Sequence, residues 1–363
     1  MSFLFLADAA PGAQATDRPF ALWLLACCAM VFLMVVIGGI TRLTESGLSI
    51  TEWQPVTGVL PPMGDQQWQA EFDKYKAIPQ YRAIHPAMTL DEFKLIFFWE
   101  YLHRLWGRLI GVVFAVPLAY FWLRGRIARR LVPRLVGLFV LGGLQGALGW
   151  YMVESGLSQR IEVSQYRLAA HLLAAVLIYG ALLWVALDLL APRVAASSDI
   201  RHARLRTGTT LVLCLVLATM TAGAFVAGLR AGLIDNTFPL MEGSFVPPDY
   251  GQLAPGYLNF FENPAAAQFD HRLLAEITWA GVAALWLYGL RVELVGQARM
   301  ALHALMLLAT VQAALGIATL LLVVPLPLAV AHQAGAMLLI AAAIVARHAL
   351  RAPRMDAISL RTL

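Results

Sequence analysis

The sequence predicts an all-α integral membrane protein in which eight transmembrane helices form two tandem, pseudo-symmetric four-helix bundles. Of its 363 residues, 60% are hydrophobic and only 13% are charged, whereas about half of an ordinary soluble domain is apolar. The apolar residues gather in eight stretches, each close to the length of about 20 residues that crosses a bilayer. Motifs in the first half of the chain also recur in the second half.

The predicted spans follow one another along most of the chain. They cover residues 20–41, 101–123, 135–153, 168–190, 209–229, 272–290, 301–323 and 328–346. The last two belong to one apolar run that contains Pro325 and Pro327. Because proline interrupts helical hydrogen bonding, we expect a tight turn between these two spans.

Charge in the short connections predicts the orientation of the spans. The connection after the second span carries no acidic residue and contains Arg124, Arg126, Arg129, Arg130 and Arg134. Such loops stay on the cytoplasmic side, so an even number of spans places both termini on the cytoplasmic side of the cell inner membrane. The net charge of +5 is explained by this topology, and we infer no nucleic-acid partner.

An internal repeat divides the chain into an N-terminal half, residues 1–200, and a C-terminal half, residues 201–363. LQGALGWYMV at 144–153 aligns with VQAALGIATL at 311–320. His103-Arg104-Leu105 matches His271-Arg272-Leu273 at nearly the same spacing, and Ser46-Gly47-Leu48 matches Ala231-Gly232-Leu233 more loosely. Each half has an even number of spans, so the two halves share one orientation in the membrane.

Four histidines obey this repeat and are the main candidates for chemistry. His103 and His171 lie near the outer starts of two spans in the first half, and His271 and His332 do so in the second. Ionisable residues inside a membrane tend to be functional, and a four-helix bundle can hold haem iron between two imidazoles. The pattern favours one bis-histidine haem site in each half. The alternatives are histidines that only bond a neighbour, and zinc, which usually needs three or four clustered ligands.

Glu100 is the candidate catalytic residue. It precedes His103 by three positions, which places both on one helical face, whereas the matched position in the second half is Gln268. This asymmetry favours a reactive site in the first half and an electron-carrying haem in the second. The alternative is an exposed Glu100–Arg104 ion pair, which would contribute little stability.

Other polar residues surround the candidate ligands. Four arginines flank them and are candidates for binding haem propionates or for snorkelling to the interface: Arg104, Arg108, Arg167 and Arg272. Glu276 and the matched Gln145 and Gln312 lie inside predicted spans and need internal partners. Their roles are left open by the sequence.

Four segments together resemble the haem A synthase family: GGITRLTESGLSITEWQPVTGVLPP at 38–62, EYLHRLWGR at 100–108, QGALGWYMVESGL at 145–157 and FDHRLLAE at 269–276. The resemblance extends over all eight predicted spans. It is to the alphaproteobacterial and mitochondrial type, which lacks outer-loop cysteine pairs. The three cysteines here lie inside apolar segments, at Cys27, Cys28 and Cys214.

The resemblance implies an oxidoreductase that converts the C8 methyl group of haem o into the formyl group of haem a by successive hydroxylations, for cytochrome c oxidase biogenesis. It implies that His103 and His171 are ligands of the substrate haem and that His271 and His332 are ligands of haem b iron. It makes Glu100 the essential acid, which either stabilises positive charge at the methyl carbon or orients the attacking water.

The resemblance also bears on partners. An electron acceptor of unidentified nature is required, and candidate partners are membrane lipid, haem o synthase, oxidase assembly factors and a second copy of the chain. Two rival functions remain from the residues alone. One is a dihaem b-type electron-transfer cytochrome, which needs the histidines but not Glu100, and the other is a transporter of hydrophobic molecules.

Overall fold

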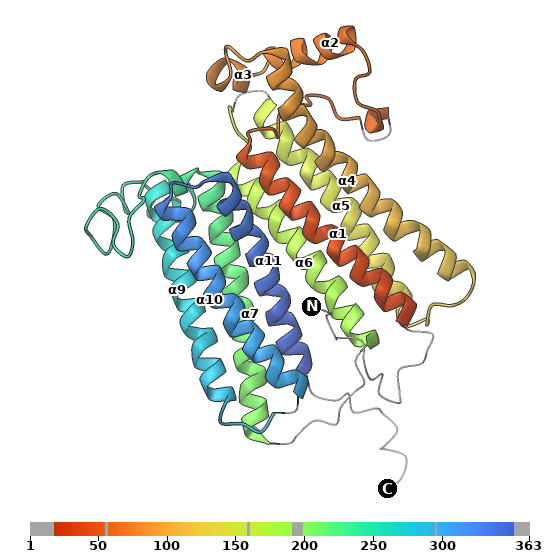
Figure 1. Ribbon diagram of the computed structural model, residues 1–363, viewed down its shortest axis with the longest axis vertical. Coiled ribbons are helices and arrows are strands. Elements are labelled where there is room, and N and C mark those ends of the chain that lie inside the picture. Colours follow the sequence, from red (N-terminus) through yellow and green to blue (C-terminus); the bar gives the residue numbers. More distant parts are fainter. Residues whose placement is uncertain (1–17, 55–56, 158–159, 191–198, 295, 352–363) are drawn as a thin grey trace.

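The computed structural model describes residues 18–54, 57–157, 160–190, 199–294 and 296–351, and in this part of the chain it contains helices and no strands (Figure 1). Eight long helices dominate. They are α1 (Arg18–Leu43), α4 (Leu90–Leu123), α5 (Val132–Leu157), α6 (Gln165–Leu190), α7 (Ile200–Gly228), α9 (Pro264–Gly289), α10 (Gly296–Leu321) and α11 (Leu326–Ala349). The outer connections contain the short helices α2 (Asp65–Lys76), α3 (Pro79–Ile84) and α8 (Asn259–Glu262), and the 3-10 turns Thr57–Val59, Ala231–Leu233 and Gly256–Leu258.

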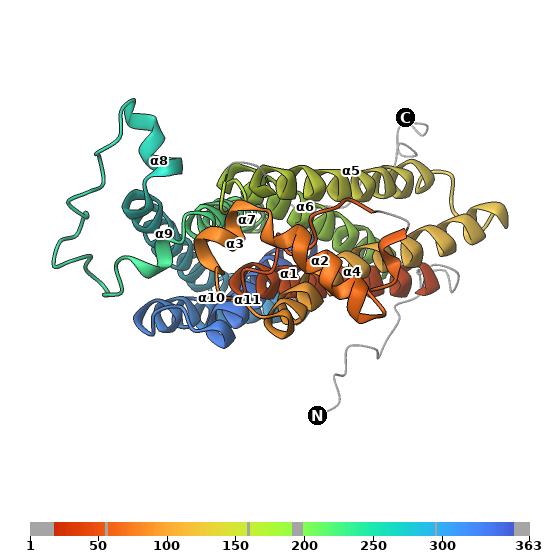
Figure 2. The same cartoon turned by 90° about the horizontal axis from the view of Figure 1, so that it is seen from above.

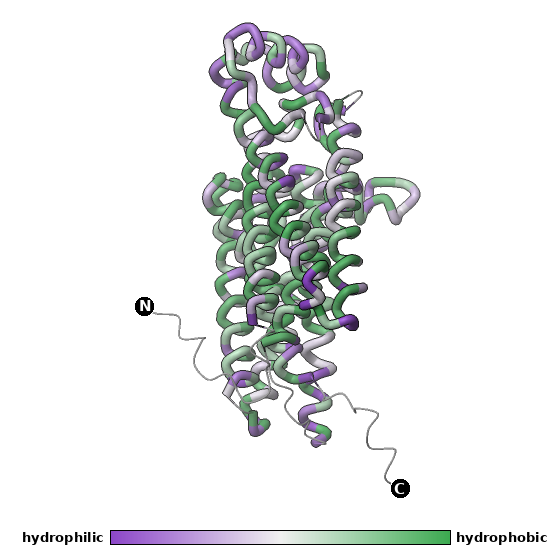
Figure 3. The backbone as a smooth tube through the Cα atoms, turned by 90° about the vertical axis from the view of Figure 1, so that its right-hand side faces the viewer, coloured by the Kyte–Doolittle hydropathy of each residue, from purple (hydrophilic) through white to green (hydrophobic). Residues whose placement is uncertain are grey.

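Seven of the long helices are long and apolar enough to cross a membrane, so the chain has the composition of a multi-pass membrane protein. The exception among the eight is α9, which has 26 residues but carries Asp270, Arg272 and Glu276 in its first half. The hydropathy view shows apolar residues along the helices and polar residues concentrated at their ends and in the outer connections (Figure 3).

Several helices begin well before the apolar stretches that predict them. Helix α4 has 34 residues and starts at Leu90 instead of residue 101, with a capping box formed by Thr89 and Glu92. At 1.5 Å per residue it is about 50 Å long and exceeds the roughly 30 Å hydrocarbon core. His103 therefore lies more than three turns inside α4, not at its start. The expectation that His103 stands near a helix start is wrong, because polar sequence continues α4 beyond its apolar part; His171, His271 and His332 lie six or seven residues after the first residue of their helices.

The expected turn between the last two helices is present. Helix α10 ends at Leu321 and α11 begins at Leu326, with Pro325 at its N-cap and Pro327 in its first turn. Proline is suited to this position because the first helical N–H groups have no intrahelical acceptor. This turn brings His332 back alongside α10.

Neighbouring helices pack in an order that repeats along the chain. Helix α1 packs on α4 and α6, and α5 packs on α6; later in the chain α7 packs on α9, and α11 packs on α10 and α7. Helices α1 and α6 also contact α11, and α6 contacts α7, which joins the two groups (Figures 1 and 2). The start of α1 and the end of α11 lie at one end of the molecule, opposite the long connections (Figure 1).

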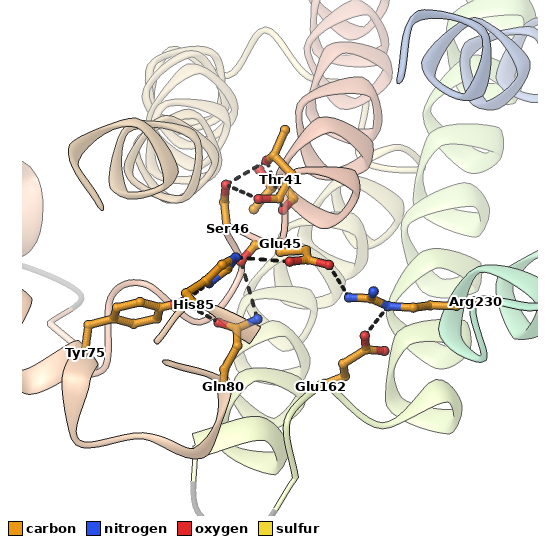
Figure 4. A network of polar contacts seen from close by, with 9 residues as sticks. Thr41, Glu45, Ser46, Tyr75, Gln80, His85, Glu162 and Arg230 are labelled. Carbon is orange, nitrogen blue, oxygen red and sulfur yellow. Dashed lines mark hydrogen bonds and ion pairs between the residues drawn. The ribbon is translucent and has the colours of Figure 1, made fainter. Parts of the chain in front are cut away.

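A polar network at the end of the molecule that carries the long connections ties the two groups of helices together (Figure 4). Arg230, which follows α7, forms ion pairs with Glu45, which follows α1, and with Glu162 before α6. Glu45 and Arg230 both adopt left-handed backbone angles, with φ of 56° and 52°. They immediately precede the matched Ser46-Gly47-Leu48 and Ala231-Gly232-Leu233 turns, so equivalent positions of the repeat carry opposite charges and pair with each other.

The first outer connection joins the same network. His85 lies 3.1 Å from Glu45 through Nε2 and 2.7 Å from the Tyr75 hydroxyl through Nδ1. Burial raises the pKa of Tyr75 above its ordinary value, so the phenol stays protonated and donates to Gln80 Oε1 at 3.1 Å. His85 thus has a structural role, because its contacts anchor helices α2 and α3 to the end of α1.

We predict that Arg230→Gln destabilises the protein, because it removes the cation that separates the carboxylates of Glu45 and Glu162. The pairs are partly exposed, so the expected loss is about 1 kcal/mol, measured as a lower melting temperature in detergent. The control is Arg201→Gln, which removes an ion pair with Asp199 at the start of α7. Equal melting temperatures for the two variants would contradict a role of Arg230 in joining the helices.

Candidate functional site

Two histidine pairs lie between helices that are distant in sequence. His271 on α9 faces His332 on α11, with ring centroids 6.5 Å apart and ring planes inclined by 81°. In the other group, His103 on α4 and His171 on α6 are close enough to interact electrostatically. The structure therefore brings together the same pairs that the repeat predicts.

The separation of the second pair suits a metal ion held between two imidazoles. An ion about 2 Å from one nitrogen of each ring would place the ring centres roughly 6 Å apart, and the observed value is 6.5 Å. No group of three or more histidine, cysteine or acidic side chains that could hold an ion occurs in the described part of the chain. Two imidazoles at this separation have the number and the spacing that axial binding of haem iron needs.

Backbone and amide groups orient the second pair. His271 Nδ1 lies 3.0 Å from the Thr219 carbonyl, and because a carbonyl only accepts, this nitrogen carries the proton and leaves Nε2 free to bind a metal. Gln312 donates to the His332 carbonyl at 2.9 Å, and its side-chain nitrogen is 3.1 Å from His332 Nδ1. Gln145 donates in the same way to the His171 carbonyl at 2.8 Å.

The first pair has fewer polar contacts. The Nδ1 atoms of His103 and His171 are buried and have no hydrogen-bond partner. Buried polar groups are nearly always satisfied, so the first pair lacks the support that the Thr219 carbonyl gives to His271. The two pairs therefore differ in local polarity although the helices around them repeat.

Glu100 lies one turn before His103 and is only 3% exposed. One carboxylate oxygen accepts from the Ser49 hydroxyl and the Ile50 N–H, both at 2.7 Å. The other accepts two hydrogen bonds from Arg104, at 2.7 and 3.1 Å. The Glu100–Arg104 pair therefore exists, but it is buried and linked to the backbone, whereas the simpler expectation was an exposed pair.

Arg104 and Arg272 fasten the segments that follow α1 and α7. Arg104 donates to the carbonyls of Ile50 and Glu52 at 2.7 and 2.9 Å. Arg272 donates to the carbonyls of Asp235 and Thr237 at 2.6 and 2.8 Å. Equivalent arginines thus hold equivalent loops over the two histidine pairs.

The other candidate polar residues lie around these loops. Arg108 donates to the Gln54 carbonyl at 2.8 Å, and Arg167 donates to the Tyr151 carbonyl while its guanidinium lies 3.6 Å from the Tyr151 ring centroid. Glu276 is exposed and lines a shallow depression with Arg272 and Phe269. Binding of propionates by these arginines stays a prediction.

Some contributors to the site were not identified from the sequence. Ser49 and the Ile50 N–H bind Glu100, and the Thr219 carbonyl orients His271. Ser49 and Ile50 lie in the GLSITEW segment that follows α1, and this motif was the one available signal. The role of Thr219 depends on the register of α7 against α9, which the sequence pattern leaves open.

Comparison with known proteins identifies the family. The family model described as cytochrome oxidase assembly protein, COX15-CtaA, matches residues 21–344. A protein named heme A synthase from Nitrosospira multiformis is 52% identical over 337 residues, which cover 93% of this chain and 95% of that protein. A protein of the same name from Rhodospirillum centenum is 52% identical over 360 residues, which cover 97% of this chain and 94% of that protein. The chain belongs to the COX15-CtaA family of cytochrome oxidase assembly proteins.

Proposed function

We propose that the chain is a haem A synthase, an oxidoreductase that converts the C8 methyl group of haem o into the formyl group of haem a by successive hydroxylations. The observation that carries this proposal is sequence identity. Over more than nine-tenths of its length, the chain is 52% identical to proteins named heme A synthase. Two histidine pairs, of which His271 and His332 face each other, and one buried carboxylate supply side chains of the kind that this activity needs.

We further propose that α9 crosses the membrane with the seven more apolar helices, so that the chain has eight spans in two tandem halves. Its 26 residues are sufficient for a bilayer, and its polar residues lie near the outer loops. Both termini would then face the cytoplasmic side of the inner membrane. The common end of the start of α1 and the end of α11 supports this arrangement (Figure 1).

The proposal gives the two histidine pairs different tasks. His103 and His171 bind the iron of the substrate, haem o. His271 and His332 would hold haem b, which when bound would supply a one-electron redox centre. Thr219 supports this second pair by orienting the His271 imidazole, and Gln312 holds the backbone carbonyl of His332.

The contacts of Glu100 bear on its role. A carboxylate has about four acceptor positions, and Ser49, Ile50 and Arg104 occupy four in the structure. To orient a water molecule, Glu100 would have to give up one of these bonds. Stabilising positive charge at the substrate methyl carbon needs no such change, since a fixed charge acts without reorganisation. We therefore propose the electrostatic role, in which Glu100 acts together with the Arg104 cation that pairs with it.

The bound haems distinguish this enzyme from the rival functions. We expect purified protein, produced in cells that make haem o, to contain haem b together with haem o and its oxidised products. His271→Ala should lose haem b, and His171→Ala should lose haem o and haem a, as measured by chromatography of the extracted haems. Haem b alone in both sites would support an electron-transfer cytochrome, and absence of haem absorbance would support a transporter.

Substituting Glu100 tests the catalytic assignment. We expect Glu100→Gln to keep both haems and to lower conversion of haem o about a hundredfold, as is typical when one charged contact to a transition state is removed. Ser49→Ala is the matched control, because it removes a hydrogen bond to the same oxygen but keeps the charge. Conversion at the wild-type rate by Glu100→Gln would show that the carboxylate only fixes the loop.

A further inference from the structure

Each of the four candidate histidines lies against a glycine of the neighbouring helix. His103 meets Gly38 of α1, His171 meets Gly149 of α5, His271 meets Gly223 of α7, and His332 meets Gly316 of α10. A methyl group at Gly38 would be 2.8 Å from His103 Cε1, and at each of the other three it would be 2.9 Å from the corresponding Cε1. These separations are too short for an alanine side chain unless the imidazole moves.

Other glycines of the same helices differ in this respect. Added methyl groups at Gly142, Gly143 and Gly146 of α5, or at Gly111 of α4, would have no atom within 4 Å. The contact with an imidazole is therefore not a general property of the small residues that let these helices approach each other. Close approach itself is more widespread, since a methyl group at Gly156 of α5 or Gly208 of α7 would lie 2.7 Å from a leucine side chain.

The four glycines follow the internal repeat. Gly149 and Gly316 occupy the same position in LQGALGWYMV and VQAALGIATL. Gly38 and Gly223 stand at equal distances before the matched turns Ser46-Gly47-Leu48 and Ala231-Gly232-Leu233. In each half, a helix that carries one of these glycines is followed by a helix that carries the histidine it contacts, and this order occurs twice. The paired helices pack together as α1 on α4, α5 on α6, α7 on α9 and α10 on α11 (Figure 1).

Glycine inside a helix is unfavourable by about 1 kcal/mol relative to alanine. Here the missing side chain lets the ring edge that contains Cε1 rest on the backbone of the partner helix. This contact limits rotation of the imidazole about its side-chain bonds, as the outer partners of metal-binding histidines commonly do. A ring that is displaced by a methyl group would point its nitrogens in another direction.

We propose that Gly38, Gly149, Gly223 and Gly316 are positioning residues that set the orientation of the four imidazoles for axial binding of haem iron. This inference rests on the proposed function, because it assigns the supports of the same two haem sites. Each glycine acts only on the site of its own half. Gly38 and Gly149 serve the substrate haem, whereas Gly223 and Gly316 serve haem b.

The test uses full-length protein purified in detergent, with the extracted haems quantified per polypeptide. Gly149→Ala should lower bound haem o and haem a about tenfold or more, the usual scale for a lost outer-shell support, and leave haem b unchanged. Gly316→Ala should lower haem b by a similar factor and leave the substrate haem in place. Gly146→Ala on α5 and Gly281→Ala on α9, whose added methyl groups meet open space or an ordinary 3.4 Å contact, are the matched controls.

Double variants separate positioning from folding. If Gly316 acts through His332, Gly316→Ala combined with His332→Ala should bind as much haem b as His332→Ala alone, with the substrate haem retained. Loss of both haems from a single glycine variant, or haem contents equal to those of the controls, would overturn the inference. Absence of haem from the wild-type protein and its histidine variants alike would instead reject the proposed function itself.

Discussion

Burial of polar side chains in an apolar helical protein is the constraint on which the rest of this structure depends. A polar group that leaves water without a new partner is costly, and in a membrane the partner must come from the protein or its ligand. His271 has the Thr219 carbonyl, and the matched glutamines Gln145 and Gln312 bind the backbone at His171 and His332. The Nδ1 atoms of His103 and His171 lack such partners.

Helix α1 lies beside both histidine pairs. Its consecutive glycines face in two directions, because Gly38 contacts His103 while Gly39 contacts Gln333, the residue next to His332. Gln333 also donates to the Val35 carbonyl of α1 at 2.6 Å. The two sites are therefore held at a fixed separation by direct contacts between α11 and α1, in addition to the outer ion pairs of Arg230.

The sequence predicted the long helices, the turn at Pro325 and the pairing of the histidines, because hydropathy and an internal repeat are properties of the chain that survive in the fold. It did not predict that α4 begins at Leu90, since the polar residues of that segment carry no hydropathy signal, although Thr89 and Glu92 form a recognisable capping box. The partners of Glu100 and the glycine contacts were also missed. Both depend on how loops and helices are placed against each other, which residue patterns within one helix do not determine.

Glu100 and Gln268 occupy matched positions of the repeat but differ in charge. Gln268 donates to the carbonyls of Ala231 and Asp235 at 2.8 and 3.2 Å and accepts from Arg272. It thus anchors the loop after α7 in the place where Glu100 anchors the loop after α1. A neutral amide is sufficient to hold such a loop, provided that the loop offers acceptors. The loop after α1 offers donors instead, the Ser49 hydroxyl and the Ile50 N–H, and Arg104 adds a buried cation, so a carboxylate matches this loop as the amide of Gln268 matches its own.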